Sequence, residues 1–422
     1  MSGGKIEAAP TAEAMARILA VTRELARPLD LNTMLTHVID AARAVLRADR
    51  GTVFLYDPKT HELYSTVATG VAELRFPANR GIVGECAETR RLISVPDCYV
   101  DPRFNREADQ KTGYRTRCLL TVPLIGYDDS LVGVMQVLNK NEGVFTELDE
   151  LIAAALAAQC AVAIQRMQML AEMLESEKMK RELAVARDIQ ARVLPKAVPR
   201  LAGYDLAGWS RPANQTGGDI FDIIALDGNR LMLLLGDATG HGLGPALSVT
   251  QVRAMLRMAV RLGADLDDAF RHINDQLVDD LPDNRFVTAF LGLLDTQNHR
   301  VVYHSGGQGP LLHFHAKTAD CEWLSASTIP MGFLAGMPLP EQRRHALEPG
   351  DILGLITDGI FEYENPESDA FGQKRVEELV IKHQNEPMTA LLQKIVHEVE
   401  RFGGLAPQTD DMTILLVRRL PA

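Results

Sequence analysis

Five aspartates are the residues of this sequence whose positions point most directly to chemistry. Each lies at one end of a short apolar run, beside glycine or a second aspartate: Asp219, Asp237, Asp358 and the pair Asp410-Asp411. Neighbouring strands of a sheet can bring such ends together although they are far apart in the chain, and glycine lets the backbone turn sharply. Taken singly, each Asp-Gly or Gly-Asp is more typical of a turn. Their conjunction predicts a convergent acidic cluster.

A convergent acidic cluster has a specific chemical requirement. Crowded carboxylates repel one another and resist ionisation unless cations neutralise them, and hard divalent ions such as Mg²⁺ or Mn²⁺ prefer oxygen ligands. Two such ions about 3.5 to 4 Å apart can acidify a shared water, direct it at phosphorus and offset the charge of the phosphoryl oxygens. The aspartates therefore predict a two-metal site for phosphate ester hydrolysis that needs no side-chain nucleophile.

Composition narrows the class of protein. The 422 residues are 46% hydrophobic and 24% charged, which is typical of a folded chain of two or three domains. The formal net charge of -12 argues against a nucleic-acid partner, because phosphate backbones are held by clustered Lys and Arg. Five cysteines without a C-x-x-C pair indicate neither a disulfide framework nor a zinc cage. The longest nearly apolar stretch, residues 151–164, is too short to span a bilayer, so we expect a cytoplasmic protein.

The elements that must position the aspartates lie after Pro199. Two helices, at residues 244–261 and 265–280, interrupt a series of short β-rich runs, and this mixture favours an α+β sandwich. The expected strands are residues 220–224, 230–235, 286–294, 301–304, 352–356 and 413–417.

The chain before the sandwich has two parts. Residues 16–140 mix an amphipathic helix, expected around residues 15–25, with short strands such as 51–56 and 131–138. Residues 145–194 contain almost no Gly or Pro and predict one or two long helices. Their apolar residues recur at spacings of three and four, and a polar stretch interrupts the series: Met167, Leu170, Leu174, Leu183, Ala186, Ile189 and Val193. This seam favours a parallel dimeric coiled coil over a spacer helix packed on its own domain.

In order along the chain, the aspartate motifs resemble those of PPM-type phosphatases of the SpoIIE and RsbU-like branch. The matching motifs are Gly217-Gly218-Asp219, Gly236-Asp237-Ala238-Thr239-Gly240-His241-Gly242, Phe286-Val287-Thr288, Thr357-Asp358-Gly359 and Gln408-Thr409-Asp410-Asp411-Met412-Thr413. The resemblance implies that Asp219, Asp237, Asp358 and Asp410 are catalytic metal ligands. It also implies ligation by the Ala238 carbonyl and by Asp411. Family members dephosphorylate a phosphoserine of a small anti-sigma-factor antagonist, so a phosphoprotein partner of that type is expected.

One stretch departs from that family pattern. The chain reads Ser305-Gly306-Gly307-Gln308-Gly309-Pro310 where the family often reads Asn-Ala-Gly-His before Pro. The metal ligands are untouched, so the departure bears on rate or substrate fit. His241 lies beside the site, where a structural or solvent-facing role is at least as well supported as general acid catalysis. It is not assigned as catalytic, and no Arg is singled out as a phosphate clamp.

The first part of the chain resembles a cyclic-nucleotide-type GAF domain. Its closing signature reads Asn139-Lys140, then Phe145, then Asp149-Glu150. The resemblance implies that Lys140 and Asp149 pair to hold the pocket rather than touch the ligand.

Direct contacts with a GAF ligand are implied for a separate set of residues. They are Ile82, Val83, Asp109, Thr112 and Thr116. On a helix, the two threonines would present their hydroxyls on one face, which suits a cyclic phosphate or a purine edge. The implied ligand is cAMP or cGMP, while binding of another small molecule, or dimerisation alone, stays open.

These expectations define an α+β protein of three parts. Residues 15–163 are a GAF sensor domain with an antiparallel sheet and helices, residues 164–197 a helical coiled-coil linker, and residues 198–422 a PPM-type α/β sandwich phosphatase domain. We expect a homodimeric, metal-dependent protein serine/threonine phosphatase that a small ligand regulates. Two alternatives remain open: a phosphoprotein-binding module without turnover, and a hydrolase of small phosphoesters.

Overall fold

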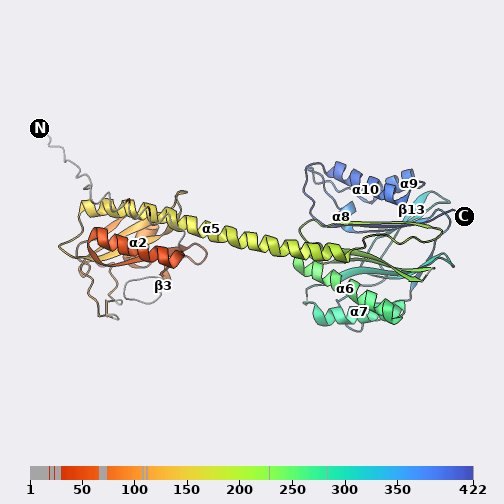
Figure 1. Ribbon diagram of the computed structural model, residues 1–422, viewed down its shortest axis with the longest axis horizontal. Helices are drawn as coiled ribbons and strands as arrows, with labels where there is room; N and C mark the ends of the chain where they lie inside the picture. The colour runs from red at the N-terminus through yellow and green to blue at the C-terminus, as the bar shows by residue number, and fades with distance from the viewer. Residues whose placement is uncertain are drawn as a thin grey trace. The chain divides into compact units, whose positions relative to one another are not determined.

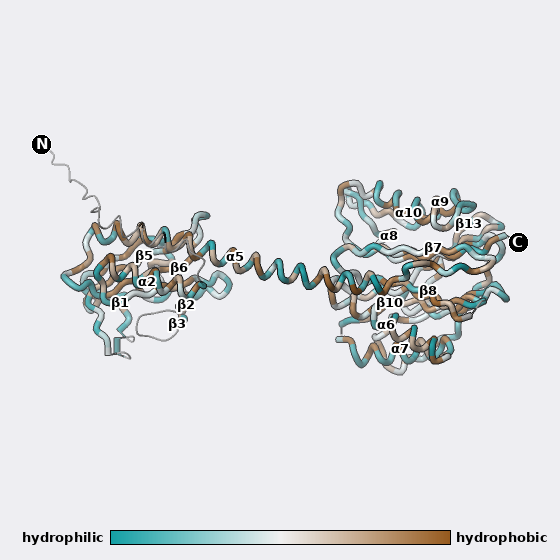
Figure 2. Tube along the Cα trace, in the orientation of Figure 1, coloured by the Kyte–Doolittle hydropathy of each residue, from teal (hydrophilic) through white to brown (hydrophobic). Residues whose placement is uncertain are grey.

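The chain folds into two compact units, Met1–Glu177 and Lys178–Ala422 (Figure 1). The structure is a computed structural model that describes residues 19, 23, 30–65, 74–106, 109–110, 113–227, 229–282 and 284–421. Of the amphipathic helix expected around residues 15–25, only Leu19 and Arg23 fall within the described residues. Hydrophobic residues are concentrated in the strands of both units (Figure 2).

The first unit is built on a six-stranded antiparallel sheet with the order β3-β2-β1-β6-β5-β4. Its strands are β1 (Ala48–Asp57), β2 (Glu62–Ser65), β3 (Leu74–Pro77), β4 (Ile93–Val95), β5 (Leu119–Ile125) and β6 (Leu131–Lys140). Its helices are α2 (Leu31–Leu46), α3 (Gly81–Thr89) and the first part of α5 (Glu147–Val193).

Each face of this sheet packs against different helices. Alternate side chains of a strand point to opposite faces. Val53 and Leu55 of β1 therefore share a core with α2 and α5, whereas Phe54 between them packs with α3. Helix α2, which the sequence analysis missed, begins where the side chain of Asp30 accepts a hydrogen bond from the backbone N–H of Thr33 at 3.0 Å.

Helix α5 confirms the prediction of long helical structure after residue 145, as one continuous helix. Beyond Ile164 its seam residues are largely exposed in the single chain, with Leu170, Leu174 and Ile189 at 48%, 64% and 59%. The coiled coil stays a prediction. No described helix, α5 included, is both long enough and apolar enough to cross a membrane.

The second unit is a sandwich of two five-stranded antiparallel sheets, ordered β14-β11-β10-β9-β8 and β13-β12-β15-β16-β7. The strands are β7 (Tyr204–Arg211), β8 (Asp219–Asp227), β9 (Arg230–Ala238), β10 (Val287–Asp295), β11 (Arg300–Gly306), β12 (Leu311–His315), β13 (Asp320–Leu324), β14 (Arg343–Ala346), β15 (Ile352–Ile356) and β16 (Met412–Arg419). The helices are α6 (Leu243–Leu262), α7 (Leu266–Asp280), α8 (Asp358–Phe361), α9 (Gln373–His383) and α10 (Met388–Gly403).

Helices cover the outer face of each sheet. Helices α6 and α7 pack on the sheet that contains β8 to β11, and α9 and α10 pack on the sheet that contains β15 and β16 (Figure 1). Strand β15 is consequently buried on both faces: Leu353 and Leu355 point into the core between the sheets, while Ile352 and Ile356 point toward α9 and α10. Helices α9 and α10 were not predicted; α6, α7 and the six listed strands were.

Removing the buried side chain of Leu355 tests the core between the sheets. Leu355 is fully buried, so Leu355→Ala is expected to lower the unfolding free energy by about 2–5 kcal/mol. Urea unfolding followed by tryptophan fluorescence reports the second unit alone, because Trp209 and Trp323 are the only tryptophans of the chain. In the matched control, Leu262→Ala, the side chain is 79% exposed and the expected change stays within about 0.5 kcal/mol. Equal losses in both variants would contradict the assignment of the core.

Candidate metal centre

The register of β8 and β9 places two predicted ligands directly opposite each other. Asp219 pairs with Asp237, at the ends of the two strands. The residue before Asp219 must be small, because a Cβ on Gly218 would lie 2.8 Å from the carbonyl oxygen of Ala238. The carbonyl oxygen of Gly218 accepts a hydrogen bond from the backbone N–H of Ala238 at 3.1 Å, which fixes the turn against the strand. Two carboxylates are thereby held side by side.

A threonine connects this pair to the other sheet. The hydroxyl of Thr357, directly after β15, donates to Oδ2 of Asp219 at 2.8 Å and accepts from the backbone N–H of Thr413 at 2.9 Å. The next residue, Asp358, begins α8. A Cβ on Gly359 would lie 2.0 Å from the carbonyl oxygen of Asp411, so only glycine lets α8 approach this closely. The ends of β8, β15 and β16 therefore meet at one place.

The adjacent acids Asp410 and Asp411 make different contacts. Both carboxylate oxygens of Asp411 accept backbone N–H groups of the loop before β8: Ala213 at 2.7 Å, Asp219 at 3.3 Å, and Gly218. A carboxylate that accepts this many amides positions the loop and keeps the strand ends together. Its predicted part as a metal ligand stays a prediction, as does that of Asp410.

The pKa values of the aspartates are raised, because several carboxylates are buried close together. Burial and the nearby carboxylates of Asp358, Asp410 and Asp411 raise the pKa of Asp237 to about 7. Burial and Asp237 raise the pKa of Asp219 well above its ordinary value. Burial and Asp410 likewise raise the pKa of Asp358. Five aspartates from four separated segments thus share one site, and their mutual repulsion is what divalent cations would relieve.

The donor set fits hard ions that retain part of their water shell. In the described part of the chain, the groups of three ligating side chains whose donor atoms all lie within 4.8 Å of one another are found elsewhere, among histidines. The aspartates are spread more widely than the ligand shell of a single ion. Mg²⁺ commonly uses one or two carboxylates and several waters, so a spread acidic site suits a pair of such ions.

Two glutamines support the site in ways that the sequence analysis did not identify. Gln190, near the end of α5, donates from Nε2 to the carbonyl oxygen of Gly217 at 2.6 Å and accepts from its N–H at 3.1 Å. Buried Gln308 accepts from the hydroxyl of Thr288 at 2.9 Å, and that hydroxyl lies 3.3 Å from the carbonyl oxygen of Asp237. Gln308, where the chain departs from the family pattern, therefore supports the strand that carries Asp237.

Glu362 also extends the acidic cluster beyond the predicted residues. Its pKa is raised by burial and by the carboxylates of Asp358 and Asp410. The sequence offered little signal for it, because it follows Asp358 by one helical turn without an adjoining motif. His241 is exposed.

The first unit confirms one predicted pair: the ammonium of Lys140 and the carboxylate of Asp149 are ion-paired. Asp109 is buried and accepts from the hydroxyl of Thr116 at 2.8 Å and from its backbone N–H at 2.7 Å. Residues 113–118 are not helical, so the helical face expected for Thr116 is wrong, because this segment is held by hydrogen bonds to Asp109 instead. Thr112 lies outside the described residues.

Ile82 and Val83, also predicted to contact a ligand, lie in α3 with their side chains packed in the core. A hollow of about 950 Å³ lies elsewhere in this unit, and its lining includes Tyr56, His61 and Arg90. None of the described residues predicted to contact a ligand lines it. Ligand contact by Ile82, Val83, Asp109 and Thr116 stays a prediction.

Two stacked antiparallel sheets with outer helices, and an acidic cluster where the sheets meet, give the second unit a PP2C-like fold. The chain matches the family model of stage II sporulation protein E (SpoIIE) over residues 227–420 and the GAF domain model over residues 30–164. It therefore consists of an N-terminal GAF domain and a C-terminal SpoIIE-type PP2C phosphatase domain. Both domain resemblances and the α+β fold class are confirmed.

Solved structures and curated relatives agree with this division. The PP2C domain of SiaA from Pseudomonas aeruginosa is 20% identical, with a TM-score of 0.51, and the match covers 58% of this chain and 98% of that one. A probable 3',5'-cyclic phosphodiesterase of Caenorhabditis elegans is 29% identical over 38% of this chain and 24% of its own. A cGMP-specific 3',5'-cyclic phosphodiesterase of Drosophila persimilis is 29% identical, and the match covers 36% of this chain and 13% of that protein. The chain thus spans a quarter or less of these relatives.

The raised pKa of Asp237 predicts how the metal-free protein responds to pH. The folded pKa is about 7 and the ordinary value 3.8, so the folded state binds more protons between these values. Stability contributed by the protonated form is therefore lost as the pH rises through this window. Asp237→Asn removes the ionisation, so the urea midpoint of wild type should fall relative to the variant between pH 5 and 8 in chelator.

The control for this comparison is Asp279→Asn, at an exposed position of α7. Its midpoint should follow the wild-type pH profile. Parallel profiles for wild type and Asp237→Asn would contradict the raised pKa.

Proposed function

We propose that this chain is a Mn²⁺- or Mg²⁺-dependent protein serine/threonine phosphatase acting on a phosphoprotein of the anti-sigma-factor antagonist type. One observation carries the proposal: aspartates from separate strand ends meet at one site where burial and mutual repulsion raise their pKa values. A site with this excess of negative charge is suited to bind divalent cations. The match to the SpoIIE family model supports the reaction class.

The proposal gives each residue of the site a role. Asp219, Asp237, Asp358 and Asp410 would hold the ions, with the carbonyl oxygen of Ala238. Bound ions would supply an acidified water and neutralise charge on the phosphoryl oxygens. The hydroxyl of Thr357 orients Asp219 by donating to its Oδ2. Because these groups are held by buried strands, little reorganisation is needed during the reaction.

The surroundings of the cluster favour a protein as substrate. Large apolar side chains are exposed near the turn that follows β9: Leu243 is 44%, Leu247 60% and Phe333 65% exposed. Phe333 packs edge-on against Phe286, whose carbonyl oxygen accepts the N–H of Thr239. Exposed apolar groups beside a charged site are typical of surfaces that bind another protein. A small phosphoester would make no use of them.

We infer that α5 connects the GAF domain to the phosphatase site. Gln190 of α5 holds Gly217 by two hydrogen bonds, and Gly217 lies two residues before Asp219. A shift or rotation of α5 would therefore move the loop that carries a predicted metal ligand. Exposed Leu170, Leu174 and Ile189 support pairing of α5 with a second copy in a homodimer, since these side chains are uncovered in the single chain.

The proposed regulatory ligand is a cyclic nucleotide, cAMP or cGMP. Support comes from the GAF domain, from its Lys140–Asp149 ion pair, and from relatives described as cyclic-nucleotide phosphodiesterases. The ligand must favour one arrangement of α5 energetically in order to change activity.

Replacing Asp237 tests the catalytic proposal. With Mn²⁺ present, full-length protein should release phosphate from a serine-phosphorylated antagonist protein and from an aryl phosphate. Asp237→Asn should lower kcat/KM by at least about 100-fold, because metal chemistry contributes several kcal/mol of transition-state stabilisation. Asp279→Asn should match wild type, and chelator should abolish turnover.

The remaining outcomes separate the alternatives. Turnover that persists in chelator would refute metal dependence. Tight binding of the phosphoprotein without turnover would identify a binding module, and turnover of small esters alone would identify a phosphoester hydrolase.

Coupling through α5 is tested with ligand titrations. One of the two cyclic nucleotides should release or absorb heat in calorimetry and change kcat of the wild type by about 5-fold or more, the usual lower range of allosteric coupling. In Gln190→Ala, the ratio of kcat with ligand to kcat without ligand should fall toward one, because the link to Gly217 is lost. Glu182→Ala, at an exposed position of α5, is the control that should respond like wild type. An unchanged response in Gln190→Ala would exclude this route.

A further inference from the structure

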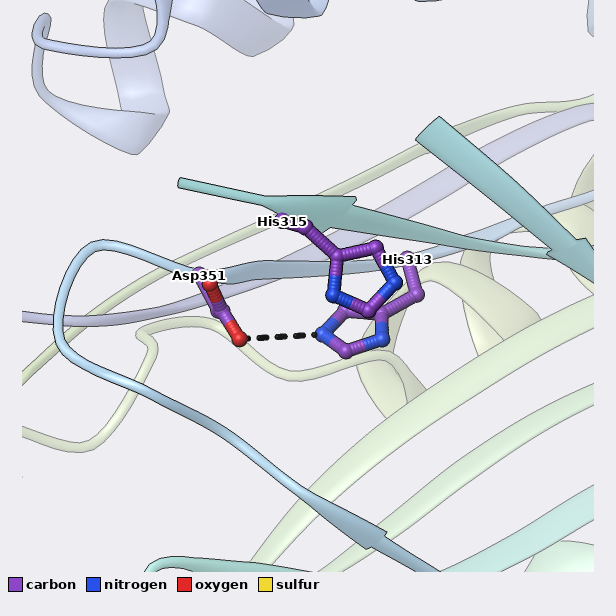
Figure 3. Close-up of side chains that lie close together, drawn as sticks. All are labelled: His313, His315 and Asp351. Atoms are coloured by element: carbon purple, nitrogen blue, oxygen red, sulfur yellow. Dashed lines mark hydrogen bonds and ion pairs between the residues drawn. The ribbon is translucent and has the colours of Figure 1, made fainter. Parts of the chain in front are cut away.

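A second cluster of metal-ligating side chains lies at the end of β15 opposite the aspartates. It consists of His313 and His315 of β12 and of Asp351, the residue before β15 (Figure 3). One donor atom of each lies within 4.8 Å of the others. Asp351 and Asp358 are seven positions apart, and a strand rises by about 3.3 Å per residue, so the two clusters are roughly 23 Å apart. The phosphatase site does not use this cluster.

The sheet explains why the three side chains meet. In the register of β12 and β15, His313 lies opposite Leu353 and Phe314 opposite Ile352, which brings His315 next to Asp351. Residues two apart on a strand share a face, and Leu311 and Leu353 of this face belong to the core between the sheets. His313 and Asp351 are each only 2% exposed. A carboxylate and an imidazole are thus buried next to each other.

The distance between His313 and Asp351 matches that of two ligands that share one ion. Nε2 of His313 lies 3.3 Å from Oδ2 of Asp351. Ligands bound tetrahedrally at about 2.0–2.1 Å are separated by about 3.3 Å, so this spacing needs little adjustment. Asp351 is held in place by the backbone N–H groups of Ala316 at 2.8 Å and Glu348 at 3.0 Å. In Figure 3 the ring of His315 lies beside that of His313, and the centroids of the two rings are 4.0 Å apart.

Both histidines have their other ring nitrogen engaged. Nδ1 of His313 lies 2.6 Å from Nε2 of His345, and Nε2 of His315 lies 3.4 Å from a carboxylate oxygen of Glu322. Partners of this kind fix the tautomer and orientation of metal-bound histidines. Nδ1 of His313 and Nε2 of His345 are closer together than two ligands of a tetrahedral ion, which are about 3.3 Å apart. The open side of the cluster is therefore the one bounded by His313, His315 and Asp351.

We propose that His313 Nε2, His315 Nδ1 and Asp351 Oδ2 form a second metal site, for a transition ion of the Zn²⁺ class. Two imidazoles and one carboxylate suit Zn²⁺ or Co²⁺, whereas carboxylates, carbonyls and water suit Mg²⁺ or Mn²⁺, so the two sites select different metals. The side chain of His315 is 35% exposed, which leaves a fourth position for water. The ion links β12 to β15 and, through His345, to β14 of the other sheet, and its role is structural.

Cobalt titration of the full-length, metal-free protein tests the proposal. Tetrahedral Co²⁺ with imidazole ligands has strong visible bands, whereas Co²⁺ in a carboxylate and water site is pale. Wild type and Asp237→Asn should both show the strong bands at one equivalent per chain, and Zn²⁺ should displace them. His315→Ala should lose the bands and bind Co²⁺ more than about 10-fold more weakly. His397→Ala, at an exposed position of α10, should behave as wild type.

Folding of the variants is controlled separately. His315 is partly exposed, so tryptophan fluorescence of His315→Ala should remain native, and His315→Cys should restore Co²⁺ binding with an added thiolate band. Zn²⁺ should raise the urea midpoint of wild type and leave that of His315→Ala unchanged. Strong bands that persist in His315→Ala, or their absence from folded wild type, would overturn the site and leave a metal-free Asp351–His313–His345 hydrogen-bond chain.

Discussion

Repulsion among carboxylates at the meeting point of two sheets is the constraint on which the phosphatase unit depends. The register of β8 and β9 puts Asp219 opposite Asp237, and the ends of β15 and β16 bring further acids to them. Buried in this way, the acids resist ionisation, and the pKa of Asp237 rises to about 7. The hydroxyl of Thr357 donates to Asp219 and opposes the rise in the pKa of that carboxyl only in part. The divalent cations proposed above would relieve the remaining repulsion within this otherwise apolar sandwich.

Helices on the outer faces make that tolerance possible. Strand β15 is covered by the opposite sheet of the sandwich on one side and by α9 and α10 on the other, so Leu353 and Ile352 are both buried. A strand anchored on both faces cannot move away to relieve repulsion at its end. The loop before β8 is less constrained, because its anchors are hydrogen bonds to Asp411 and Gln190. Adjustment of the site is therefore expected in this loop, where α5 reaches it, rather than in the sheets.

Much of this arrangement was predictable because each element carries a local signal. Strands buried on both faces read as uninterrupted apolar runs, and residues 352–356 are such a run. The aspartates stood out because glycine accompanies them at strand ends. Helix α10 was overlooked although Leu391, Ile395 and Val399 show helical spacing. The helical spacing of these residues is a local signal of the same kind as that of α6.

Other features depend on contacts between distant parts of the chain and have no local signal in the sequence. Asp411 follows Asp410 directly, yet only the fold shows that its oxygens are occupied by three backbone amides. The non-helical path around Thr116 is set by buried Asp109, whose position the sequence does not reveal. His313 and His345 are 32 residues apart in different sheets, and no spacing rule connects them. Long-range contacts of this kind position the functional side chains. Hydrophobic periodicity predicts only which helices and strands form.

The two ends of β15 present two different sets of potential metal ligands. At one end the donors are carboxylates spread beyond the reach of a single ion; at the other, two imidazoles and a carboxylate lie within 4.8 Å of one another. Ligand softness and spacing differ together, so an ion that satisfies one end is poorly matched to the other. The strand that links them is buried on both faces and transmits position along its length. An ion held at the histidines would therefore stiffen the strand that presents Asp358, without taking part in hydrolysis.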